Sequence, residues 1–249
     1  MLPRLFTLLL LAVSTAVARG DDSAPPSTPA RSEAAVIRWS FDGDADATRL
    51  TAAIPGAQPL VLTPRGKVQL GVPGPRPSVY PDFTPSNTAL RLTPGPNFLA
   101  VHDPGDASLL DFTNGDSITL ECWVRWEEPL KGSYPYLIGK GRTHSGPGTT
   151  HNHNYALRLA NSSKGVFPSF LFADAESAAR PRPDDSAWHR WTASEGIIED
   201  GGWHHVAVTY TFGDPESIRG YVDGRPVKGV WDAGGPTTQA PVVDNDQLW

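Results

Sequence analysis

Acidic side chains could give this chain a hydrolytic activity, because two carboxylates on one strand face can hydrolyse a glycosidic bond. A retaining glycosidase holds its two carboxyl groups about 5 to 5.5 Å apart. The sequence has no run of acids at the alternate positions that would provide this. Glu195 and Glu199 flank an apolar tripeptide with no acid between them, and Asp214 and Glu216 fall in a predicted loop. We therefore expect no glycoside hydrolysis by this route.

Motifs for nucleophilic catalysis are also missing from the sequence. No G-x-S-x-G run is present to expose a serine nucleophile. Cys122 is the single cysteine, so it can form neither an internal disulfide nor a cysteine-pair zinc site. We expect it to be a small buried hydrophobe. The sequence thus predicts a protein that is not an enzyme.

Three histidines share one polar stretch, namely His144, His151 and His153. Imidazoles two positions apart on an extended segment could share a transition metal with a third. No carboxylate stands beside them in the sequence, so a solvated loop is the simpler interpretation.

Calcium is the one cofactor that the sequence favours. Asp42, Asp44 and Asp46 in FDGDAD, and Asp244 and Asp246 in DNDQ, have carboxylates spaced as they are in loops that bind Ca²⁺. A structural turn rich in Asp and Gly has the same composition. Both interpretations stay open.

Eight tryptophans are many for this length. Trp39, Trp123 and Trp203 fall in strand patterns, where packing accounts for them. The candidate ligand-binding residues are Trp188, Trp191 and Trp231, which lie in less regular, polar surroundings. Aromatic planes of this kind can stack against a sugar ring, and packing within loops is the alternative.

Strands must position these residues, because apolar and polar side chains alternate in several segments. The alternation covers 116–126 and 203–212, and strands are also expected near 36–41, 134–141, 154–160, 166–174 and 189–196. Asp223-Gly224 provides the positive-φ pair of a type I′ hairpin, and Pro226 places the return strand at a sheet edge. Two short strands are expected in 89–103, a long surface excursion in 60–83, and at most one turn of helix in 109–116.

The order of these strands resembles the laminin-G-like, concanavalin A-like jelly-roll domains of bacterial secreted proteins. The residues that carry the resemblance are E-C-W-V, L-I-G-K-G, Y-A-L-R-L, G-W-H-H-V-A-V-T-Y and Y-V-D-G. It implies an all-β fold, a two-sheet antiparallel jelly-roll sandwich. In the resembling family an L-W-I-G-S type of sequence opens further strands, so the chain, which stops at Leu248-Trp249, is expected to be a fragment without its last strands.

The N-terminus has the pattern of a cleaved signal peptide at 1–18, with Arg4, an apolar run from Leu5 to Val13, and Ala16-Val17-Ala18 as the cleavage site. A Pro/Ser-rich linker at 19–35 follows, and one domain spans 36–249. We expect a secreted, periplasmic or cell-surface protein without membrane insertion after signal cleavage.

The chain of 249 residues has a net charge of −6, which argues against nucleic acid or another polyanion as partner. The function that the sequence favours is a non-catalytic recognition or adhesion module that binds carbohydrate or an extracellular protein surface. An accessory or structural domain of a larger exported enzyme is the alternative. A glycoside hydrolase is the third hypothesis, and the missing carboxylate pair disfavours it.

Overall fold

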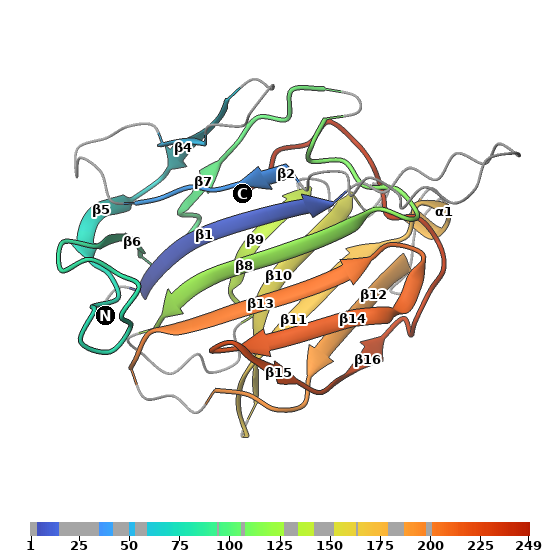
Figure 1. The fold of residues 1–249 in the computed structure, drawn as a ribbon. Helices are drawn as coiled ribbons and strands as arrows, with labels where there is room; N and C mark the ends of the chain where they lie inside the picture. The colour runs from blue at the N-terminus through green and yellow to red at the C-terminus, as the bar shows by residue number, and fades with distance from the viewer. Residues whose placement is uncertain are drawn as a thin grey trace, which may run out of the picture.

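The protein is built almost entirely of antiparallel strands (Figure 1). This computed structural model describes residues 4–14, 35–41, 50–52, 59–93, 95–105, 108–126, 134–141, 152–162, 164–178, 187–197 and 201–249. Among them, the helix α1 (Ala175–Ala178) has only four residues, and no helix is long and apolar enough to cross a membrane. The expected all-β jelly-roll class is confirmed.

The larger sheet has eight strands in the order β15-β14-β13-β8-β1-β6-β5, and β2 also pairs with β1. Its members are β1 (Arg4–Ser14), β2 (Ala35–Ile37), β5 (Val68–Pro73), β6 (Thr88–Leu92), β8 (Ser117–Arg125), β13 (His204–Thr211), β14 (Asp214–Val222) and β15 (Arg225–Val227). A short sheet of three strands is formed by β3 (Leu50–Ala52), β4 (Leu60–Arg65) and β7 (Phe98–Ala100).

The second large sheet has five strands in the order β16-β12-β11-β10-β9. They are β9 (Tyr136–Gly141), β10 (His153–Ser162), β11 (Gly165–Ala173), β12 (Trp188–Ala193) and β16 (Gly229–Ala233). In Figure 1 this sheet lies behind the eight-stranded sheet, with its strands crossing behind those of β8 and β13. The two layers form a sandwich.

The core lies between these two layers and follows the predicted alternation. On β8, Ile118, Leu120, Cys122 and Val124 are buried, and their sequence neighbours are only partly buried. Aromatic rings join the sheets, since Phe170 of β11 lies 5.4 Å from Tyr210 of β13 between ring centroids. Edge contacts between such rings add to the free energy of burial. Burial also raises the pKa of the Cys122 thiol, which keeps it protonated.

The predicted hairpin is confirmed. Asp223 and Gly224 have φ values of 51° and 73°, as a type I′ turn requires. The Asp223 carboxylate accepts hydrogen bonds from the His205 backbone N–H at 2.9 Å and pairs with His204 Nδ1 at 2.8 Å. Beyond the turn, β15 lies at the edge of the sheet, where Pro226 needs no backbone donor.

Four expectations for local structure need correction. Asp214 and Glu216, which were expected in a loop, lie in the strand β14. Residues 60–83 contain the regular strands β4 and β5, because Leu60, Leu62, Leu70 and Val72 alternate into the core. The many prolines and glycines there made the segment look irregular, but Pro64, Gly71 and Pro73 are accommodated within the two strands, and the others lie between or after them. In 109–116 the chain forms turns instead of helix, and in 36–41 the strand ends at Ile37, although Trp39 and Phe41 remain in the core.

Residues Arg4–Ser14, part of the predicted signal peptide, form β1 in this structure. The strand pairs with β8 on one side and with β6 and β2 on the other. An apolar run satisfies the requirements of an export signal and of an inner strand equally well. The signal peptide therefore stays a prediction, and its removal would leave β6 and β8 each with one unpaired edge.

Deleting residues 1–18 measures what this strand contributes. Eight register pairs between β1 and β8 would be lost. At a net ~1 kcal/mol for each backbone hydrogen bond, we expect the free energy of unfolding in urea to fall by about 3 kcal/mol or more. Exposed edges should also raise the fluorescence of an added hydrophobic dye. Equal unfolding midpoints for the full and the shortened chain would contradict this pairing.

Candidate functional site

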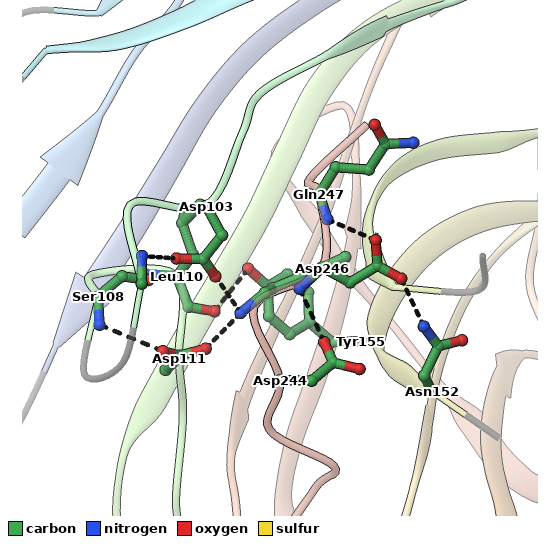
Figure 2. Close-up of polar contacts among 11 residues, drawn as sticks. Asp103, Ser108, Leu110, Asp111, Asn152, Tyr155, Asp244, Asp246 and Gln247 are labelled. Atoms are coloured by element: carbon green, nitrogen blue, oxygen red, sulfur yellow. Dashed lines mark hydrogen bonds and ion pairs between the residues drawn. The ribbon is translucent and has the colours of Figure 1, made fainter. Parts of the chain in front are cut away.

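A buried lysine ties β9 to the segment that follows β7. Lys140 points into the sandwich with its side chain 0% exposed, and its ammonium contacts carboxylate oxygens of Asp103 and Asp111. Both carboxylates also accept backbone hydrogen bonds, Asp103 from Gly105 N–H and Asp111 from Ser108 N–H, and Figure 2 shows the bond between Ser108 and Asp111. A buried charge is tolerated when it is paired and hydrogen-bonded in this way. The cluster is therefore well suited to fix the backbone around it.

Tyr155 of β10 completes this interior group. Its hydroxyl donates to the Leu110 carbonyl at 3.1 Å, as Figure 2 shows. Burial raises the pKa of Tyr155 well above its ordinary value, and the charges of Asp111 and Asp103 raise it further. The phenol is consequently neutral, and it acts as a hydrogen-bond donor beneath the sheet.

The predicted calcium residues Asp244 and Asp246 lie in the C-terminal segment beside this group (Figure 2). Asp244 accepts from the Asp246 N–H at 3.1 Å, and Asp246 accepts from the Gln247 N–H at 2.7 Å and from the Asn152 side chain. These are the bonds of a turn. In the described ranges no three His, Cys, Asp or Glu residues gather as a metal site. Asp42, Asp44 and Asp46 lie outside those ranges, so calcium stays an untested prediction.

The three candidate tryptophans do not share an exposed surface. Trp191 is 3% exposed and packs in the core, where Gly220 and Gly229 leave room for its ring. Trp231 is half-buried, and its ring lies 5.7 Å from that of Tyr210. Trp188 and Trp191 belong to one strand, and a spacing of three residues places them on opposite faces. The expectation of irregular surroundings for these tryptophans did not reveal that Trp188 and Trp191 face opposite sides of one strand.

Trp188 instead belongs to a group on the other side of the five-stranded sheet, the face turned away from the core. We call it the outer-face cluster, and its members are Tyr134, Tyr136, His153, Arg158, Trp188 and Trp249. The ring of His153 lies 5.8 Å from Tyr136 and 4.7 Å from Trp188, and Tyr136 lies 5.2 Å from Trp249. Of the three histidines considered as metal ligands, His153 is thus packed among aromatic rings, and His144 and His151 lie outside the described residues.

Strand register brings Arg158 into this cluster. Tyr155 and Leu157 of β10 are in the core, so Arg158 is on the opposite face. It is in register with Tyr136 on β9 and Ser169 on β11. Its guanidinium carbon lies 4.7 Å from the ring centroid of Tyr134 and 5.7 Å from that of Tyr136. Such stacking stabilises a cation over an aromatic face.

Burial lowers the pKa of the Arg158 guanidinium, and the nearby Arg190 lowers it further while Tyr136 opposes the shift. Arg158 is only 7% exposed, and its Nε has no hydrogen-bond partner among the described residues. Arginine stays charged in proteins nonetheless. The cluster therefore carries a positive charge that is poorly solvated. In the sequence, Arg158 is a single cation within an apolar strand, and this pattern could have identified it as a candidate residue.

The C-terminal residues join the two groups. Trp249 and Gly139 exchange backbone hydrogen bonds of 2.8 and 2.9 Å, and the Trp249 indole donates to the Gly141 carbonyl at 2.7 Å. A Cβ at Gly139 would lie 2.5 Å from the Trp249 ring, so only glycine leaves room for the ring there. The backbone fixed by Lys140 on one face thus supports the aromatic cluster on the other.

Replacing Lys140 by methionine tests this support. The variant leaves the carboxylates of Asp103 and Asp111 buried without their cation. Breaking a buried pair in this way typically costs about 3–5 kcal/mol, and we expect a loss of that order in the free energy of unfolding. The exposed Lys67→Met is the matched control and should change stability by less than about 0.5 kcal/mol. Similar unfolding curves for the two variants would contradict a structural role for the Lys140 group.

Comparison with known families agrees with this architecture. A family model named Laminin_G_3, described as concanavalin A-like lectin/glucanases superfamily, matches residues 101–246. The match covers more than half of the chain and includes β8 to β16. No curated protein and no solved structure matches the chain. The resemblance seen in the strand motifs is confirmed, and the chain belongs to the Laminin_G_3 family of the concanavalin A-like superfamily.

Proposed function

We propose that this protein is an exported, non-catalytic recognition module that binds carbohydrate through the outer-face cluster. Domains of this superfamily are commonly carbohydrate-binding or adhesion modules. Export rests on the signal peptide predicted at 1–18. Adhesion to an extracellular protein surface is the alternative use of the same face.

The observation that carries the proposal is the gathering of aromatic rings from three strands and their flanks on one face of a sheet. Tyr134 is 52% exposed, and Tyr136, Trp188 and Trp249 are each partly exposed beside it. Aromatic planes bind the C–H faces of sugar rings, and their polar edges provide hydrogen bonds. A group of rings around a cation is more readily explained by ligand binding than by core packing, because it lies outside the core.

Support for binding without hydrolysis comes from the acids near this face. Glycoside hydrolysis needs two carboxyl groups placed across the bond. In the part of the chain that the structure describes, the outer-face cluster contains no carboxylate. Asp232, on the neighbouring β16, pairs with Arg190 of β12 at 2.7 Å. The superfamily also includes glycosidases, and this composition favours the non-catalytic members.

A glycan array followed by calorimetry with the glycans that bind tests the proposal. Tyr134→Ala should weaken binding about tenfold, because a stacking contact of this kind contributes roughly 0.5–1.5 kcal/mol beyond the buried area of the ring. Tyr221→Ala, on β14 of the other sheet, is the matched control and should bind as the parent protein does. Absence of any bound glycan, or equal losses in the two variants, would refute the assignment.

A further inference from the structure

We propose that the outer-face cluster is specific for a sugar that carries a carboxylate, a uronic acid residue within an otherwise neutral glycan, and that Arg158 binds this carboxylate. This inference rests on the proposed function and names its ligand class. A partner of this chemistry follows from the charge balance of the cluster.

The first observation is that Arg158 is buried and that no carboxylate of the described residues pairs with it. Its exposed fraction is 7%, its Nε lacks a hydrogen-bond partner, and among the described residues no carboxylate contacts it. A buried charge is ordinarily paired, because taking it out of water is costly. Lys140, the other buried cation on β9 and β10, has two carboxylates. Because Lys140 already has its carboxylate partners, Arg158 is the buried cation that can bind an anion from outside the chain.

The nearest charged groups do not remove this imbalance. Arg190 adds positive charge, and it is paired with Asp232 through its Nε. The carboxylates of Asp103 and Asp111 contact Lys140 on the core side of the sheet. Two tyrosines cover the Arg158 guanidinium, and they hold it in place without supplying charge. A ligand carboxylate would supply the missing negative charge.

Guanidinium geometry and the surrounding rings suit a sugar that carries a carboxylate. The planar guanidinium matches a carboxylate in a two-bond arrangement. Tyr134, half-exposed above the guanidinium, offers a face for the sugar ring that bears this carboxylate. The net charge of −6 repels a polyanion as a whole. Because Arg158 is the cation of this cluster and the protein as a whole is negative, the site favours a single acidic sugar residue among neutral ones.

The experiment compares neutral and uronic-acid-containing oligosaccharides on one array, and then measures the best acidic oligosaccharide and its methyl ester by calorimetry. The ester keeps the ring and removes only the negative charge. We expect the acid to bind at least tenfold more tightly than the ester. We expect Arg158→Met to abolish that difference, and Arg158→Lys, which keeps the charge and loses the planar geometry, to restore part of it.

Arg225→Met is the matched control, an exposed arginine on β15 of the other sheet, and it should retain the tenfold preference. Thermal unfolding checks the fold, because removing an unpaired buried cation should leave the melting temperature of Arg158→Met equal or higher. Equal binding of acid and ester, or an unchanged preference in Arg158→Met, overturns the inference. If neutral glycans bind and only Tyr134→Ala weakens their binding, the proposed carbohydrate function holds and the specificity for a uronic acid is refuted. If no glycan binds, both proposals are refuted.

Discussion

From Tyr155 to Leu159, successive side chains of β10 point to opposite faces of the five-stranded sheet, and both the core and the position of Arg158 depend on this alternation. A register shift between His153 and Tyr155 interrupts it. Leu157 and Leu159 pack into the sandwich, and Arg158 lies between them on the other side. A shift of one residue in the pairing of β10 would exchange these faces. It would bury the guanidinium among apolar side chains and expose the aromatic core. The same packing that stabilises the fold therefore fixes the position of the cation.

Two buried cations on adjacent strands, Lys140 and Arg158, differ in how their charges are paired. Lys140 is neutralised by two carboxylates, which are themselves held by backbone amides, and this arrangement contributes rigidity. Arg158 is stacked on tyrosine rings that cannot neutralise it. The two groups are linked through Gly139 and the Trp249 ring. The core side is a rigid base, and on the outer side no carboxylate of the described residues contacts the cation. This combination suits a preformed binding surface, which loses little conformational freedom when a ligand binds.

Local pattern was sufficient to predict most of the sandwich. The alternation in β8 and β13 and the Asp223-Gly224 turn are properties of neighbouring residues, so the sequence alone reveals them. The outer-face cluster was not predictable in that way, because the register of β9, β10 and β12 brings its members together from segments far apart in the chain. The sequence singles out Trp188 but does not separate it from Trp191 and Trp231, since composition does not say which face a side chain takes. At Arg4–Ser14, an apolar run matched a signal peptide and a strand equally well.

The central claim is that ligands bind on the outer face of the five-stranded sheet, and the eight tryptophans provide its most direct test. Each indole N–H gives a separate resonance in a nitrogen–proton NMR spectrum. Titration with a glycan that binds should shift the signals of Trp188 and Trp249, which belong to the outer-face cluster, and leave those of the core residues Trp39 and Trp191 in place. Shifts confined to Trp203 or Trp231, with Trp188 and Trp249 unchanged, would place the ligand elsewhere and contradict the account.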